Sequence, residues 1–388
     1  MEGWLGRSGR GVRSLVRRSV GTLRAARALR SGTPEVRRGA LVSLWFGPPP
    51  LGVGWLHSYA ARALIGALSD RDPGIRRLVL DVLGRVADAR VIPALTEALR
   101  NDPDTECRAM AAGSLGRQVD RAVVPALVES LRSDPDEWVR SVCAQALGNR
   151  GDESVLPALR EALHADPSRI VRVDALQALH KLDAPDFLPL ASERLTQGER
   201  WERGAAAGLI RVRKAPDAIP ILRAALSAEA DKGVRRHMAS GLAELGEAGI
   251  EVLLALLRES GDDARLRLSI CLGLGHGETP AAAEHLGELL DDADRCVRHA
   301  VPWAASRIVG PGRPEVVERA LQHRFPGVRR EALRALAQRG AASDIPSVQA
   351  LTTDAWRSVR EAAQAALREI TAREERLALY LGRQREAR

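Results

Sequence analysis

The residues of this chain that could bind a metal or carry out catalysis do not fall at spacings typical of either role. Eight histidines and four cysteines are scattered over 388 residues. The C-x-x-C and H-E-x-x-H spacings of metal sites do not occur, and neither does a G-x-S-x-G nucleophile turn or a G-x-x-x-x-G-K-[ST] phosphate loop. The sequence therefore predicts no metal site, no cofactor and no catalytic residue, and it favours a non-enzymatic protein.

One arginine returns at a nearly constant interval. The segment Asp134–Gly148, DPDEWVRSVCAQALG, has a Val-Arg pair at its centre, and versions of it recur along the chain. Such periodicity is typical of stacked-repeat architectures. Eleven equivalent residues cannot form one active site, so we interpret this arginine column as structural. Its members are Arg37, Arg76, Arg108, Arg140, Arg172, Arg203, Arg235, Arg267, Arg298, Arg329 and Arg360.

Each period predicts two short helices. The first, such as Val123–Arg132, has proline in its first turn, where a missing N–H costs no helical hydrogen bond. An Asp-Pro-Asp turn follows, and we expect its carboxylates to cap the second helix, which carries Val-Arg-x-x-Ala-x-x-Ala-Leu-Gly. We expect Gly84, Gly116 and Gly148 to end their helices in the left-handed conformation.

This pattern resembles the short HEAT-type repeats of armadillo-like α-solenoids, especially those named after the phycobilisome lyases. The resemblance extends from Thr22 to Glu369. It implies an all-α fold, a right-handed α-solenoid of about eleven two-helix HEAT-like repeats. It also implies a ladder between the repeated arginine and the turn aspartate. The aspartates four residues before their arginines are Asp72, Asp104, Asp136, Asp231, Asp263 and Asp294.

The chain divides by composition into three parts. We assign residues 1–15 to a basic N-terminal segment, 16–370 to the solenoid, and 371–388 to a charged C-terminal helix or tail that caps the last repeat. Residues 1–38 hold ten arginines and two glutamates, which equals the net charge of +8 of the whole chain. The remainder is balanced, so a basic nucleic-acid groove is disfavoured.

The N-terminal region has two interpretations. Apolar residues from Val12 to Ala26 fall on one helical face and arginines on the other, as in a membrane-surface helix or a transit peptide. The same region also aligns with the repeat, which favours a capping first repeat. No apolar run is long enough for a transmembrane helix. The cysteine spacing is not that of a disulfide framework, which indicates a reducing, cytoplasmic location.

A Pro-rich insertion at residues 46–55 separates the first two repeats. Three consecutive prolines cannot continue a helix, so the segment is expected to be a loop. Its apolar residues Trp45, Phe46 and Trp55 could cover the end of the stack or bind a partner.

The repeat breaks its own pattern at Pro302, which falls inside a predicted second helix. His299, Trp303 and Arg307 share one face of that helix, and we expect Trp303 to be exposed there. Positions one, five and nine after each repeated arginine should point into the concave surface. The candidate binding residues on this surface are His299, Trp303, Arg307, Arg330, Arg334, Arg77, Gln145, Gln177, Lys181 and Arg236. The alternative is a kinked repeat whose tryptophan packs on its neighbour.

These observations favour a scaffold or adaptor that binds a protein or peptide partner along the concave face. The resemblance implies an alternative, a lyase or chaperone acting on a cofactor-bearing protein. A third hypothesis is nucleic-acid binding through a local basic patch.

Overall fold

The computed structural model describes residues 24–30, 32–46, 54–86, 89–150, 152–277, 282–308 and 313–386. Throughout these ranges the regular structure is α-helix with a few short 3₁₀ turns and no strand. The basic segment 1–15 and the prolines of the insertion lie outside the described residues. The chain forms two compact units, Met1–Phe187 (unit 1) and Leu188–Arg388 (unit 2), each described by itself below.

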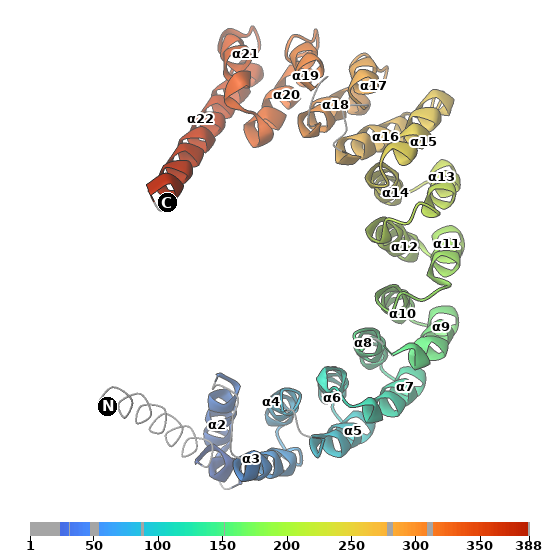
Figure 1. The fold of residues 1–388 in the computed structure, drawn as a ribbon, viewed down its shortest axis with the longest axis vertical. Coiled ribbons are helices and arrows are strands. Elements are labelled where there is room, and N and C mark those ends of the chain that lie inside the picture. Colours follow the sequence, from blue (N-terminus) through green and yellow to red (C-terminus); the bar gives the residue numbers. More distant parts are fainter. Residues whose placement is uncertain are drawn as a thin grey trace. The chain divides into compact units, whose positions relative to one another are not determined.

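Unit 1 is built of helical hairpins whose helices form two layers (Figure 1). Each hairpin contributes a first helix to one layer and a second helix to the other. The first helices are α3 (Gly54–Ala67), α5 (Val91–Asn101), α7 (Val124–Ser133) and α9 (Leu156–Ala165). The second helices are α2 (Pro34–Phe46), α4 (Pro73–Leu83), α6 (Thr105–Arg117), α8 (Glu137–Gly148) and α10 (Arg169–Lys181).

Unit 2 repeats this arrangement (Figure 1). Its first helices are α11 (Phe187–Gln197), α13 (Ala218–Ala228), α15 (Glu247–Glu259), α17 (Ala283–Leu289), α19 (Arg313–Leu321) and α21 (Ile345–Ala350). Its second helices are α12 (Arg200–Arg213), α14 (Lys232–Glu244), α16 (Ala264–Gly277), α18 (Arg295–Arg307), α20 (Pro326–Arg339) and α22 (Arg357–Glu386). The predicted all-α solenoid is confirmed, and each of the eleven repeated arginines lies in a second helix.

Leucine, valine and alanine between the two layers form the core of each unit. In one hairpin of unit 1, Leu127 of α7 and Leu147 of α8 are fully buried, as is Val139 at the start of α8. Helices of 10 to 14 residues are marginal alone. They are stable here because each hairpin buries its apolar stripe against its neighbours.

In most repeats the repeated arginine joins its hairpin to the next through two parallel hydrogen bonds. Arg108 Nε and Nη2 lie 2.9 and 3.1 Å from the two carboxylate oxygens of Asp134, and both side chains are largely buried. Its Nη1 donates to the carbonyl oxygen of Asp102 at the start of its own turn. We call this arrangement a rung. The described rungs of this kind are Arg76–Asp102, Arg108–Asp134, Arg140–Asp166, Arg203–Glu229, Arg267–Asp292 and Arg329–Asp354. Arg37 and Asp70 form a seventh, in which Nη2 donates to one carboxylate oxygen and Nε lies 2.7 Å from the other as an ion pair.

The expected ladder partner is therefore wrong in most repeats. Asp134, the partner of Arg108, lies six residues before Arg140, the arginine of the next repeat. Asp136 lies four residues before Arg140 and instead caps α8 by accepting from the Trp138 N–H. One exception is Arg235, which binds Asp263, an aspartate that also caps α16. The two acids of these turns thus have different roles. The first joins repeats, which the sequence did not predict, and the second caps the helix, as expected.

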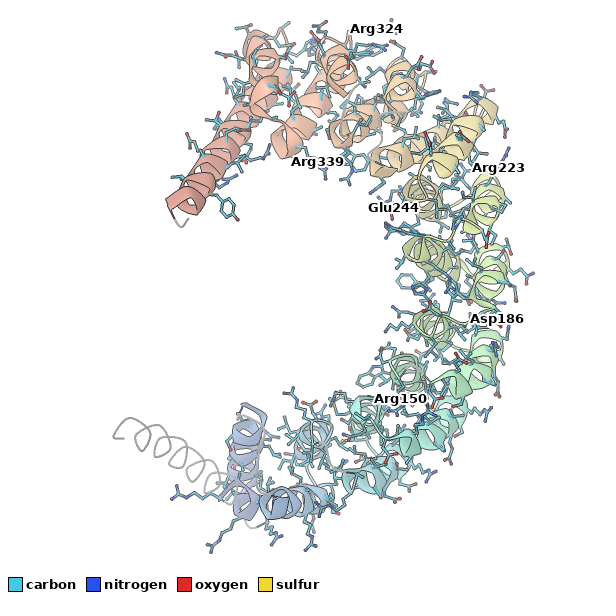
Figure 2. All side chains as sticks on the ribbon, in the orientation of Figure 1. Arg150, Asp186, Arg223, Glu244, Arg324 and Arg339 are labelled. Atoms are coloured by element: carbon cyan, nitrogen blue, oxygen red, sulfur yellow. The ribbon has the colours of Figure 1, made fainter. Side chains whose placement is uncertain are left out.

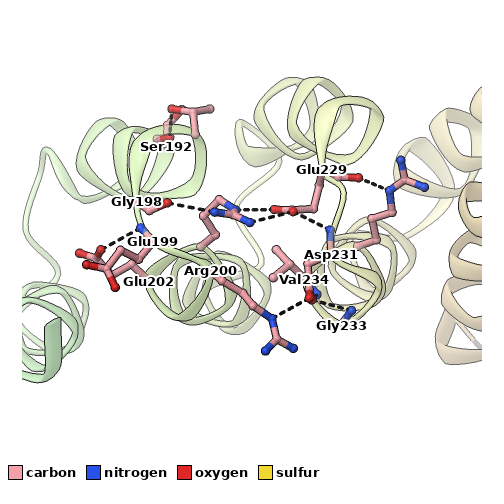
Figure 3. Close-up of polar contacts among 12 residues, drawn as sticks. Ser192, Gly198, Glu199, Arg200, Glu202, Glu229, Asp231, Gly233 and Val234 are labelled. Atoms are coloured by element: carbon pink, nitrogen blue, oxygen red, sulfur yellow. Dashed lines mark hydrogen bonds and ion pairs between the residues drawn. The ribbon is translucent and has the colours of Figure 1, made fainter.

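Figure 3 shows a rung in unit 2, between α12 and α14. Glu229 accepts from Arg203 Nε and Nη2, and it also accepts from the Asp231 N–H at 2.8 Å, which fixes the turn. Arg200 Nε lies 2.6 Å from Asp231, the capping residue, so a second arginine of the same helix pairs with the second acid of the next turn.

The expected left-handed stops at Gly84, Gly116 and Gly148 are wrong. Gly84 has φ −61°, and Gly116 and Gly148 lie inside α6 and α8. A Cβ at Gly148 would lie 2.6 Å from the Cβ of Ala178 in α10. Glycine is needed at these positions because neighbouring second helices approach too closely for a side chain.

The C-terminal segment is a continuation of α22. Ile370 is fully buried, and Arg373 donates to the carbonyl oxygens of Gly340 and Ala337, so the helix packs on α20 up to this point. Leu379 and Tyr380, further along, are 66% and 60% exposed. Of the segment expected to cap the last repeat, Arg373 and Glu374 contact that repeat, whereas Leu379 and Tyr380 lie on its exposed continuation.

We expect Asp134→Asn to lower the free energy of unfolding by about 1.5–3 kcal/mol, because Arg108 loses a charged, largely buried partner. The matched control is Arg132→Gln, which removes an ion pair to Glu161 whose side chains are both about half exposed. Its expected effect is within about 0.5 kcal/mol. Urea unfolding followed by circular dichroism measures both, and equal effects would contradict a structural role for the rung.

We expect Gly148→Ala to destabilise the protein by about 1–3 kcal/mol, since the added methyl group overlaps Ala178. Gly208→Ala in α12 is the control, because a Cβ there has no heavy atom within 4 Å. It should stabilise by about 0.5–1 kcal/mol through helix propensity. Thermal unfolding of the two variants should therefore shift in opposite directions.

Candidate binding surface

The candidate residues of unit 1 lie on its second helices at successive repeats. Gln145 of α8 and Gln177 of α10 are exposed, one repeat apart. Lys181 Nζ donates to Asn149 Oδ1 at 2.9 Å, and Arg77 forms an ion pair with Glu106. Both contacts join one repeat to the next: Arg77–Glu106 is an ion pair, and Lys181 donates to a neutral amide.

Unit 2 places an aromatic and cationic cluster on its second helices. Helix α18 continues through Pro302, and Trp303 packs edge-on against His276 of α16, with ring centroids 5.3 Å apart. Arg307 lies over the Trp303 ring at 5.3 Å, and its Nε donates to the carbonyl oxygen of Gly275. Trp303 is half-buried. The expected exposure of this residue is therefore wrong, because His276 and Arg307 cover part of the indole.

Polar residues of α12 and α14 extend this cluster. Arg211 Nη1 donates to Glu244 at 2.8 Å, and Arg236 is exposed. Figure 2 shows Glu244 projecting from α14 on the side opposite to Arg223 of α13. We call Arg211, Arg236, Glu244, His276, Trp303 and Arg307 the unit 2 face.

The remaining candidates of unit 2 lie on α18 and α20. His299 packs over Gly327, where a Cβ would lie 2.5 Å from the ring Nε2. Arg330 and Arg334 both donate to Glu331, at 3.1 and 3.0 Å. The structure thus brings Trp303 and Arg307 into contact, whereas His299 packs on the next repeat.

His276 was missed by the sequence analysis although the signal was present. It is the ninth residue after Arg267, the position that Arg307 occupies after Arg298. Taking positions one, five and nine after the arginine in every repeat would have found it. Its contact with Trp303 joins two repeats, which spacing alone does not reveal.

The histidines of this region experience a positive field. The pKa of His276 is lowered, first by burial and then by Arg307, with Glu244 opposing. Burial and neighbouring arginines also lower the pKa of His237 and of His299. Burial, followed by the neighbouring arginines, thus favours the neutral form of these three rings.

Within the described residues no group of three or more histidine, cysteine or acidic side chains could hold a metal ion. No described helix combines the length and apolar character needed to cross a bilayer. Burial raises the pKa of the Cys107 thiol to about 12, which leaves it protonated and unreactive.

Comparison with known families identifies the repeats. The HEAT-repeat family model matches residues 23–116, 93–180, 124–211 and 312–368. The chain belongs to the HEAT-repeat family. No curated protein matches the sequence.

Solved structures with the same fold include two large HEAT-type proteins. Kap95p, in a structure that describes its binding to RanGDP, is 13% identical, with a TM-score of 0.59, covering 90% of this chain and 54% of Kap95p. The karyopherin Kap121p, bound to the extreme C-terminus of the phosphatase Cdc14p, is 15% identical, with a TM-score of 0.61, covering 90% of this chain and 45% of Kap121p. This HEAT-repeat chain thus spans about half the length of either protein, and the likeness shows the fold alone.

The phycocyanin lyase complex of CpcE and CpcF from Nostoc sp. PCC7120 is also similar, at 23% identity. The match covers 61% of this chain and 92% of that one, with a TM-score of 0.35. A score this low carries no argument for a shared activity, so the lyase alternative gains no support.

We expect the protein to lose stability as the pH falls below about 6.5. His237, His276 and His299 have lowered pKa values in the folded state, so the unfolded chain binds protons first. The stability that these neutral histidines contribute is fully present above their pKa in the unfolded chain. It is lost progressively as the pH falls toward their lower pKa in the folded protein. The triple variant His237→Gln, His276→Gln, His299→Gln should show a smaller drop in Tm between pH 7.5 and 5.5.

The matched control for this experiment is His164→Gln, at an exposed position of α9 in unit 1. Its drop in Tm over the same pH range should equal that of the wild type. A triple variant as pH-sensitive as the wild type would show that these rings do not govern the acid response.

Proposed function

We propose that this HEAT-repeat protein is a non-enzymatic scaffold that binds a protein or peptide partner on its second helices. In unit 2 the contact centres on Trp303. A half-buried aromatic ring between a neutral imidazole and a guanidinium is a common anchor at protein interfaces. The polar rim is supplied by Arg236, Glu244 and Arg211.

The fold supports this proposal because stacked helical hairpins create long surfaces suited to binding other macromolecules. Kap121p is described bound to the extreme C-terminus of Cdc14p and bound to Pho4p. By analogy we assign the same general task to this chain. We place it in the cytoplasm, since its cysteines are free and Cys107, Cys143 and Cys271 are buried as thiols.

The insertion between α2 and α3 is a second proposed contact. Its aromatic residues Trp45, Phe46 and Trp55 have side chains outside the described residues, so their role stays a prediction. A deletion of residues 48–54 tests it separately from the unit 2 face.

We expect Trp303→Ala to reduce partner recovery about tenfold or more in affinity capture followed by mass spectrometry, because truncating an interface anchor costs about 2 kcal/mol or more. Trp356→Ala is the matched control, since it removes a 58% exposed tryptophan at the start of α22, away from the unit 2 face.

Circular dichroism must first show that both variants are folded. Equal recovery by wild type and Trp303→Ala would exclude the unit 2 face as the main contact. Recovery of a small molecule or a nucleic acid in place of a protein would overturn the proposed function itself.

A further inference from the structure

The turn between α19 and α20 has no acid at either of two positions, six and four residues before the repeated arginine, although each turn from α4 to α18 and the turn before α22 has at least one. In the turn before α14, Glu229 completes a rung and Asp231 caps the helix. The equivalent residues before α20 are His323 and Phe325, with Arg324 between them. Figure 2 shows Arg324 at this turn of unit 2. Two negative charges are therefore replaced by an imidazole, an aromatic ring and an added positive charge.

Arg298 is the arginine left without a rung. Its Nη1 retains the usual bonds to the carbonyl oxygens of Asp292 and Ala293. Its Nε is buried without a hydrogen-bond partner, and no described carboxylate pairs with the guanidinium. In place of a carboxylate, the ring of Phe325 lies 4.6 Å from the guanidinium carbon.

His323 preserves the turn but not the rung. Its Nδ1 accepts from the Phe325 N–H at 3.2 Å, as Glu229 accepts from the Asp231 N–H in the turn before α14. The ring proton therefore lies on Nε2, which faces Asp291 at 3.4 Å. The imidazole thus fixes the backbone while offering Arg298 no negative charge.

A second arginine has lost its partner at the same turn. Arg295 occupies the position of Arg200, three residues before the repeated arginine, and Arg200 pairs with Asp231. The residue equivalent to Asp231 is Phe325, so Arg295 is exposed and has no ion pair to a described residue. The guanidinium carbon of Arg324 also lies over the Phe325 ring, 4.8 Å from its centroid.

We propose that this turn is a docking site for an acidic peptide segment of a partner protein. Its carboxylates would pair with Arg295, Arg298 and Arg324 beside the 37% exposed ring of Phe325. The occupant is inferred from the molecule itself, because seven rungs show the same arginine holding a carboxylate through Nε and Nη2.

A peptide suits the site better than a nucleic acid. Asp291 beside His323 and Glu331 near His299 border the three arginines, so the positive surface is confined to one turn, which suits a short acidic segment better than an extended polyphosphate. The site lies at a turn and does not include the unit 2 face. The proposed peptide site can therefore be tested separately from the proposed role of Trp303.

The test uses fluorescence anisotropy of the full chain with a fluorescein-labelled hexaglutamate peptide at low ionic strength. The variant His323→Asp, Phe325→Asp restores both missing acids within the chain. We expect it to weaken peptide binding at least tenfold and to raise Tm, because Arg298 and Arg295 regain partners. Arg295→Gln, Arg324→Gln should also weaken binding and leaves His323 and Phe325 in place.

The matched control is Arg200→Gln, which removes the equivalent arginine from an intact turn and should leave peptide affinity unchanged. Trp303→Ala should also leave it unchanged. The proposal is overturned if hexaglutamate fails to bind the wild type, or if either double variant binds as tightly as wild type. Equal binding of hexaglutamine, or tighter binding of a single-stranded DNA 12-mer, would likewise exclude an acidic-peptide site.

Discussion

The structure depends on a pair of parallel hydrogen bonds between an arginine and the carboxylate of the next repeat. Each hairpin is too short to be stable alone, and apolar attraction between hairpins is non-directional, so it specifies their register less sharply than a directional bond does. The planar guanidinium does fix it, because Nε and Nη2 must meet two oxygens at once while Nη1 binds the backbone of its own turn. The carboxylate in turn holds the backbone of its own turn, as the bond from Asp136 N to Asp134 shows. Every rung therefore positions a turn, a helix start and a neighbouring repeat together.

The close approach of the second helices is the complementary constraint. Gly116 faces Ala146 and Gly148 faces Ala178, so a glycine near the end of one helix meets an alanine of the next. In unit 2, Gly275 meets Ala304 in the same way, and this contact brings the Trp303 ring against the backbone of α16. The small residues thus do more than permit packing. They set the distance at which side chains from adjacent repeats, such as His276 and Trp303, can touch.

The sequence was sufficient to predict the fold but only part of the surface. Eleven arginines at a regular interval predicted the helical hairpins, because periodicity reports local structure repeated many times. The rung partner was predicted wrongly because each turn offers two acids before the arginine, and only the three-dimensional path decides which one reaches back. Gly148 was assigned to a helix stop because the alanine that excludes a side chain lies thirty residues away, in another repeat. Trp303 lies on the predicted face, but its burial depends on His276 of the preceding helix. Partner binding at this face depends on how the side chains of adjacent repeats are arranged as well as on their residue types.

The irregular repeat around α18 affects how the repeat array unfolds. In a linear array, cooperativity passes only between nearest neighbours, so one weak junction divides the array into segments that open separately. Pro302 cannot donate to the carbonyl oxygen of Arg298, and the same arginine lacks its carboxylate. Both deficits fall at the junction of α18 with α20. We therefore expect amide hydrogens of α20 and α22 to exchange with solvent as a group distinct from those of α14 and α16, and a protease that cuts a transiently opened chain to find its first site near this junction.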